Sequence, residues 1–206
     1  FISGALASVM DMSSTIFSYG ACEMSLMVAA MAEMAHHYHL PFLGTAGSSD
    51  AKFPDQQAAT EITFSCLSSA LSGANLIHDA GFLDHSALLS PAAMVLQNEI
   101  LYMVKQYMRG VPVDDETLAL DLIDRVGPGR SFVSEDHTLN HFRDVWYSRL
   151  FDRTQLARWL DRGGRRFDDR LRDLTIEAMA LPSEPLPDEV SHDLDLLAAE
   201  WAARSD

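Results

Sequence analysis

The fold of this chain is decided by residues 40–59, which read LPFLGTAGSSDAKFPDQQAA. The apolar start of this stretch predicts a short buried strand, and the pattern that opens at Asp55 predicts a helix. A loop of small and polar residues, 44–55, lies between them. In α/β proteins such a loop is where ligands bind, although many are plain connections. The stretch therefore predicts a strand, a candidate binding loop and a helix in succession.

The same unit recurs on both sides of this stretch. Three short apolar segments are each followed by a polar loop and a long helical pattern. The expected strands are Ile2–Leu6, Phe42–Thr45 and Asn75–His78, and the expected helices are Ala21–Tyr38, Asp55–Leu71 and Pro91–Met108. Because a helix between each pair of strands implies right-handed crossovers, we expect an α/β fold with about three parallel strands over residues 1–110.

After residue 110 only helical patterns remain, which predicts a helical extension over residues 111–206. Its first helix is expected to begin at Asp114 and to stop at Gly127, because acidic residues favour a helix start and glycine favours a helix end. The further expected helices are Glu135–Phe151, Thr154–Asp161, Arg165–Ala180 and Asp188–Ala203.

Composition limits the classes of function. The 15 basic and 30 acidic residues give a net charge of −15, which disfavours nucleic acid and anionic membranes and suits a neutral or cationic ligand, although an acidic surface also serves solubility alone. Cys22 and Cys66 lie in apolar helical patterns, so we expect reduced thiols and a cytoplasmic setting.

Neither a signal peptide nor a membrane span is indicated. The chain starts with Phe1 inside a strand pattern, which predicts a piece of a longer protein.

Polar residues follow the expected strands, where a sheet would bring them to one edge. They are Asp11 after Ser8–Met10, Asp50 and Lys52 in the loop, and His78 with Asp79 and Asp84 further on. His78 is the sharpest candidate, because it ends a buried strand with an imidazole, yet a strand-end histidine is as often a satisfied core residue. The three histidines in His36–His39 lack metal-ligand spacing, and we expect no metal site there.

Several motifs together resemble the trimethylamine:corrinoid methyltransferase family. They are Ser8–Met12, Leu40–Asp55, Gly73–Leu83, Val113–Asp121, Val126–Gly129 and His137–Arg143, and the resemblance covers about three quarters of the chain. It implies the C-terminal part of a TIM (β/α)8 barrel with a following helical appendage. Residues 1–110 would then be the partial barrel.

The resemblance also implies an activity. Family enzymes hold a methylated amine at the mouth of the barrel and pass its methyl group to the Co(I) of a corrinoid (cobalamin) on a separate protein. Pyrrolysine, found in members that act on trimethylamine, would stand at or near Ser48, but the sequence has none. This departure favours the branch that resembles glycine betaine:corrinoid methyltransferases. The implied substrate contacts are His78 first, then Asp11, Asp50 and Ser48.

Two other hypotheses stay open from the sequence. The chain could be a non-catalytic scaffold that docks a corrinoid protein, or part of an unrelated TIM-barrel lyase that uses His78 and Asp11 for acid–base chemistry. For the methyltransferase, we expect the corrinoid on the partner protein, no cofactor bound tightly to this chain, and an inactive isolated segment. We also expect self-association into a homo-oligomer, because an incomplete barrel exposes sheet edges.

Overall fold

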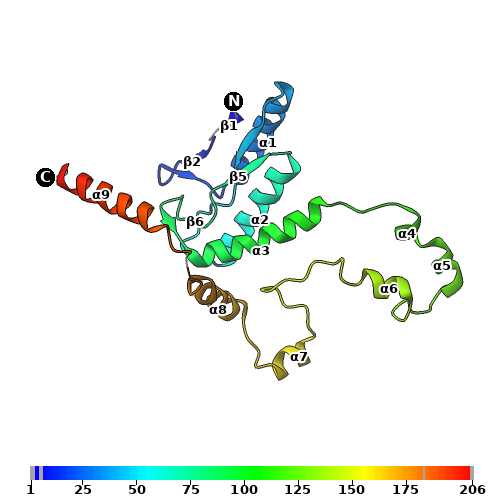
Figure 1. The fold of residues 1–206 in the computed structure, drawn as a ribbon. Coiled ribbons are helices and arrows are strands. Elements are labelled where there is room, and N and C mark those ends of the chain that lie inside the picture. Colours follow the sequence, from blue (N-terminus) through cyan, green and yellow to red (C-terminus); the bar gives the residue numbers. More distant parts are fainter. Residues whose placement is uncertain (1–2, 5–6, 183, 205–206) are drawn as a thin grey trace. The chain divides into compact units, whose positions relative to one another are not determined.

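The computed structural model describes residues 3–4, 7–182 and 184–204, coloured along the chain in Figure 1. The chain forms two compact units, residues 1–175 and residues 176–206, and each is described by itself. The predicted strand Ile2–Leu6 lies largely outside the described residues. Only its centre, Ser3–Gly4, is described, as strand β1.

A parallel sheet carries the first unit. It contains β1, β4 (Phe42–Thr45) and β5 (Leu76–His78) in the order β1–β4–β5. Phe42 lies opposite Ser3, and Thr45 lies opposite His78. The predicted strand Phe42–Thr45 is therefore confirmed, and so is the α/β class. Within the described part of the chain this sheet is open and does not close into a barrel.

The first unit contains three long helices, and all three were predicted to within one residue at each end. They are α1 (Cys22–His37), α2 (Gln56–Leu71) and α3 (Pro91–Met108). Local chemistry fixes where two of them begin. Asp55 Oδ1 accepts hydrogen bonds from the backbone N–H groups of Gln57 and Ala58, and Ser90 Oγ accepts one from Ala93. Such caps satisfy N–H groups that the first helical turn leaves unpaired.

The core of the first unit forms in two places. Helices α2 and α3 pack against each other, as Figure 1 shows, around the fully buried Ile62, Leu96 and Ile100. Helix α1 packs against β4 through Val28 and Phe42. Burying a side chain of this size stabilises a fold by roughly 1.5–3 kcal/mol, so these contacts hold the carboxyl edge of the sheet in place.

Two short antiparallel hairpins interrupt the βα units, and the sequence patterns did not predict them. The first, β2 (Val9–Asp11) with β3 (Ile16–Ser18), lies between β1 and α1. The second, β6 (Phe82–Leu83) with β7 (Leu88–Leu89), lies between β5 and α3. The expectation that Asp11 ends a strand of the parallel sheet is therefore wrong, because β2 pairs with β3.

After α3 the first unit continues as short helices joined by loops (Figure 1). They are α4 (Asp115–Leu118), α5 (Leu120–Val126), α6 (Asp136–His141) and α7 (Leu156–Asp161), followed by α8 (Phe167–Met179), which crosses the boundary between the units. The predicted helix that starts at Asp114 is broken at Ala119, whose φ is 48°. A left-handed residue of this kind interrupts helical hydrogen bonding.

The predicted helix Glu135–Phe151 is wrong beyond His141. The chain instead leaves the helix, and the backbone N–H of Arg149 donates to Glu99 Oε1 of α3 at 2.9 Å. Leu150 beside it is fully buried. A contact with a distant helix thus replaces local helical bonds here.

The second unit contains α9 (Asp188–Arg204), close to the predicted Asp188–Ala203. Its described residues are exposed to solvent. Throughout the described residues, no helix combines the length and the apolar character that crossing a membrane requires.

His141 ties α6 to α4 and gives this region a predicted pH dependence. Its Nδ1 lies 2.7 Å from Asp144 Oδ2, its Nε2 lies 3.2 Å from Glu116 Oε1, and its ring lies 4.4 Å from the ring of His137. The bond to Asp144, with that to Glu116, raises the pKa of His141 above its ordinary value of about 6.5. These pairs therefore stabilise the folded chain fully below pH 6.5, and the stabilisation is lost as the pH rises through the raised pKa.

We expect an NMR titration of the chain to show His141 with a pKa above the ordinary histidine value of about 6.5. Protection factors of the amides in α4 and α6, which correct for the base-catalysed intrinsic exchange, should fall as the pH rises through the His141 midpoint. The variant His141→Gln should lose this pH dependence, and the same pH dependence in the variant would contradict the assignment.

Candidate functional site

The carboxyl ends of β4 and β5 meet at one edge of the parallel sheet, and polar side chains gather there. Thr45 Oγ1, at the end of β4, lies 3.2 Å from His78 Nε2 at the end of β5. His78 Nδ1 lies 2.6 Å from Asp79 Oδ1. Both nitrogens of His78 are thus engaged, while 44% of its side chain stays exposed. The imidazole is held in one orientation at the open edge of the sheet.

Glu61, in the second turn of α2, fixes the loop 46–55 through hydrogen bonds. Glu61 Oε2 accepts hydrogen bonds from Ser49 Oγ (2.6 Å) and from the backbone N–H of Asp50 (2.9 Å). Its Oε1 accepts from Gln57 Nε2 at 2.8 Å. Ser49 is fully buried, and its Oγ in turn accepts from the N–H of Ala51. The loop is therefore fixed in shape by the helix that follows it.

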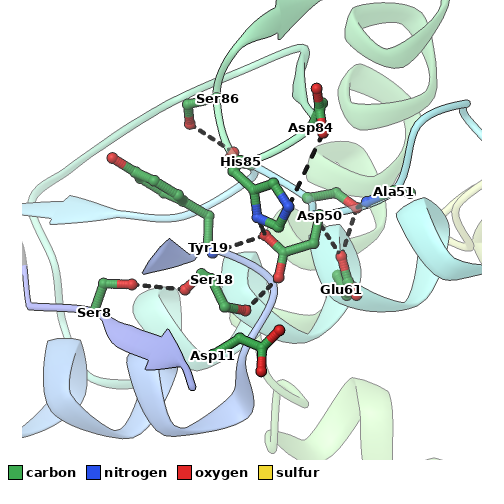
Figure 2. Close-up of polar contacts among 12 residues, drawn as sticks. Ser8, Asp11, Ser18, Tyr19, Asp50, Ala51, Glu61, Asp84, His85 and Ser86 are labelled. Carbon is green, nitrogen blue, oxygen red and sulfur yellow. Dashed lines mark hydrogen bonds and ion pairs between the residues drawn. The ribbon is translucent and has the colours of Figure 1, made fainter. Parts of the chain in front are cut away.

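Asp50 joins three segments that are distant in sequence, as Figure 2 shows. Ser18 Oγ donates to its Oδ2, and the backbone N–H of Tyr19 donates to its Oδ1 at 2.8 Å. His85 Nδ1, from the tip of the β6–β7 hairpin, lies 2.9 Å from the same Oδ1. Only 15% of the Asp50 side chain is exposed. Because both carboxylate oxygens are occupied, Asp50 organises this edge of the sheet.

Lys52 extends the network toward solvent. Its Nζ donates to the backbone carbonyl of Asp50 (2.7 Å) and lies 3.0 Å from Asp84 Oδ1 and 3.3 Å from His85 Nε2. An ammonium group has donors only, so the facing Nε2 accepts and the ring proton belongs on Nδ1, toward Asp50. We call Ser18, Tyr19, Asp50, Lys52, Asp84 and His85 the Asp50 cluster.

The tip of the β6–β7 hairpin is strained. Asp84, His85 and Ser86 have φ values of 49°, 56° and 66°, a left-handed run that costs roughly 1–2 kcal/mol per residue. Contacts with the loop offset this cost: Asp84 N–H donates to the carbonyl of Ala51 (2.9 Å), and Ser86 Oγ lies 2.8 Å from Ser48 Oγ. Strained turns held in this way cluster at functional sites.

The structure places three of the four residues predicted for substrate contact at this edge. Asp50 and the buried Ser48 lie in the loop, and His78 lies at the end of β5. Asp11 lies on the β2–β3 hairpin, with its carboxylate accepting hydrogen bonds from Ser13 and Ser14. The bond from Ser14, followed by those from Ser13, lowers the pKa of Asp11 to about 2.

His85 and Glu61 were missed by the sequence reasoning. Glu61 occupies an ordinary position in a helical pattern, so nothing local marks it. His85 had a signal: residues 82–89 read FLDHSALL, two short apolar pairs separated by four polar or small residues. That pattern is typical of a hairpin. Within the described residues, no group of three or more His, Cys, Asp or Glu side chains is arranged to hold a metal ion.

This chain is similar in sequence to known proteins over most of its length. A family model described as trimethylamine methyltransferase (MTTB) matches residues 1–202. Trimethylamine methyltransferase MttB of Desulfitobacterium hafniense is 36% identical over 198 residues, which cover 96% of this chain and 40% of that protein. Trimethylamine methyltransferase MttB1 of Methanosarcina acetivorans is 32% identical over 176 residues, covering 85% of this chain and 36% of that protein.

A relative with a different printed substrate also matches. The glycine betaine methyltransferase of Desulfitobacterium hafniense (strain Y51) is 33% identical over 160 residues, covering 77% of this chain and 33% of that protein. The chain spans about two fifths or less of the length of these relatives.

Proposed function

Because this chain belongs to the trimethylamine methyltransferase family, we propose that the whole protein moves a methyl group from a methylated amine to a corrinoid carried by a separate protein. The observation that carries the proposal is the family match over residues 1–202. The Asp50 cluster supports it, because it stands at the edge where (β/α) enzymes bind their ligands.

The charge of the site suits a cationic amine. The carboxylates of Asp50, Asp84 and Asp79 lie at this edge, in a chain of net charge −15. Their attraction for a cation is stronger here than in bulk water, because the protein screens charges less than water does. This chain's share of the reaction is to bind the amine, orient its methyl group outward and exclude water. A reduced corrinoid on the partner protein would supply the electron pair for the new bond to the methyl carbon, and the nitrogen would keep the pair of the bond that breaks.

We infer that the amine is quaternary and resembles betaine. The glycine betaine methyltransferase among the relatives supports this. The sequence supports it as well, because it has no pyrrolysine, and Ser48 stands at or near the position where pyrrolysine would be expected. A quaternary nitrogen leaves as a neutral tertiary amine, so no covalent help from the protein is needed. His78 and Lys52 are both partly exposed at the edge, and each would bind a carboxylate on the substrate in place of a present partner, Asp79 for His78 and Asp84 for Lys52. Asp11, Asp50 and Ser48 stay proposed substrate contacts.

We further propose that the open sheet continues in the whole protein into a TIM (β/α)8 barrel, with residues 1–110 as part of the barrel and residues 111–206 as its helical extension. We propose that the protein works in the cytoplasm and self-associates through exposed apolar surface, such as Leu76 on β5, which is 55% exposed. A strictly monomeric mass in light scattering would contradict the self-association.

The activity is tested with the whole protein, a reduced corrinoid protein and a panel of methylated amines. We expect release of the demethylated amine, measured by mass spectrometry, with glycine betaine among the substrates. Binding of the corrinoid protein without release of any demethylated amine would favour a non-catalytic scaffold and reject the methyl transfer.

The variant His78→Ala tests the first of the site residues. Turnover should fall at least about tenfold, since the loss of one hydrogen bond to a charged group costs roughly 1.5–3 kcal/mol. His192 of α9 is exposed and provides the control, because His192→Ala should keep normal turnover. Equal rates for His78→Ala and His192→Ala would remove His78 from the site.

A further inference from the structure

The β2–β3 hairpin exposes apolar side chains on both of its faces. Met10 and Phe17 are cross-strand partners and are 40% and 55% exposed. Ile16, on the opposite face because side chains alternate along a strand, is 44% exposed, and Met12 in the turn is 82% exposed. A two-stranded hairpin is marginally stable alone, and exposed apolar patches mark interaction sites. We therefore expect the apolar side chains of this hairpin to contact another molecule.

The hairpin is fastened to the candidate site at its base. Ser8 Oγ donates to the carbonyl of Ser18 at 2.7 Å, which closes the open end of the hairpin. Ser18 and the N–H of Tyr19 then bond to the two oxygens of Asp50 (Figure 2). Whatever covers the hairpin thus lies beside the Asp50 cluster.

A further exposed aromatic residue borders the same cluster from the loop. Phe53 is 72% exposed and directly follows Lys52, whose Nζ is bonded to the carbonyl of Asp50. The hairpin and Phe53 therefore stand on two segments that are linked through Asp50, and each carries exposed apolar side chains.

The charges around this surface indicate the chemistry of its partner. Asp11 on the hairpin is an exposed carboxylate that stays ionised, because hydrogen bonds from Ser14 and Ser13 lower its pKa to about 2. Asp55 and Asp84 are further carboxylates near the loop, and Lys52 is paired with Asp84. An apolar patch bordered by carboxylates is complementary to an apolar patch bordered by lysine or arginine.

We propose that the β2–β3 hairpin and Phe53 form the docking surface for the protein that carries the methyl acceptor, through a patch of apolar and basic side chains on that protein. The inference rests on the proposed function. A methyl group bound beside Asp50 can reach an acceptor on another protein only if that protein covers the surface around the site. The hairpin is fastened beside Asp50 and exposes Met10 and Phe17, so it lies in that surface.

The experiment compares two acceptors for the whole protein: its corrinoid protein and free cob(I)alamin, which needs no docking surface. The double variant Met10→Thr/Phe17→Thr keeps β-forming side chains and removes the apolar face. We expect its KM for the corrinoid protein to rise at least tenfold, equal to about 1.4 kcal/mol. Its turnover with free cob(I)alamin should stay within about twofold of the unaltered protein, as expected where only docking is lost.

Two further variants keep the outcome decisive. Phe53→Ser lies in a loop and should raise the same KM at least threefold, even if the hairpin variant fails to fold. Leu26→Gln on α1 is the matched control, because Leu26 is 71% exposed but lies on a helix, and its KM should not change. Unchanged KM values for the folded hairpin variant, or for Phe53→Ser, would overturn the docking surface. Lack of turnover by the unaltered protein with either acceptor would instead overturn the proposed function.

Discussion

Asp50→Ala is expected to lower the free energy of unfolding of this chain by about 3 kcal/mol, because a hydrogen bond to a charged group contributes roughly 1.5–3 kcal/mol and a buried donor left unpaired costs roughly 1–3 kcal/mol. The carboxylate is 15% exposed and holds Ser18, the N–H of Tyr19 and His85. Its loss leaves the Tyr19 N–H without its acceptor and frees the strained tip at His85. Urea unfolding followed by circular dichroism measures the change.

The matched control is Asp11→Ala, which also removes a carboxylate that accepts hydrogen bonds from serine. Asp11 is exposed, and its bonds reach only Ser13 and Ser14, two and three residues away. Its removal should shift the urea midpoint far less than Asp50→Ala does. If both variants unfold at the same urea concentration, Asp50 does not hold the three segments together.

Asp50→Ala should also reduce turnover by the whole protein about 100-fold, since a displacement of about 1 Å at a reacting group can cost that much. The variant Asp50→Asn keeps the shape and one acceptor oxygen, and should lose less stability. A large loss of turnover in Asp50→Asn with near-normal stability would show that the charge itself serves the reaction.

The elements that the sequence predicted well are those set by local signals. Helix α3 begins at Pro91 after the cap Ser90 and follows a regular apolar period to Met108. Strand β4 matched residue for residue, because the apolar run and the glycine-containing loop bound it on both sides. Such signals need no knowledge of the rest of the chain.

The sequence predictions were wrong or incomplete where contacts between residues distant in sequence determine the structure. Nothing near Arg149 in the sequence indicates that its N–H pairs with Glu99 and ends the helical course. In the same way, the loop around Asp50 was identified as a binding loop, but its partner His85 is 35 positions away. Only the folded chain brings the β6–β7 tip onto that loop. The candidate edge was therefore predictable, while the pairing within it was not.

Gly47→Ala is expected to destabilise the chain by about 3 kcal/mol or more, for two reasons that add. Gly47 has a φ of 97°, a conformation that costs an alanine of order 1–3 kcal/mol. A Cβ at this position would also collide with the side-chain amide of Gln97, which is buried. Gln97 Oε1 accepts from the N–H of Gly81 at 2.9 Å, so moving it leaves a buried N–H unpaired, at roughly 1–3 kcal/mol.

Gly127→Ala separates the two reasons. Gly127 also has a positive φ, 72°, but a Cβ there would meet open space, so only the backbone cost of about 1 kcal/mol applies. The collision is tested by Gln97→Ala, which makes room for the new methyl group. The double variant Gly47→Ala/Gln97→Ala should be less destabilised than the sum of the single variants, by about 1 kcal/mol or more in urea unfolding. Additive effects, or equal losses in Gly47→Ala and Gly127→Ala, would show that Gly47 is needed for its backbone conformation alone and not for the close approach of the loop to α3.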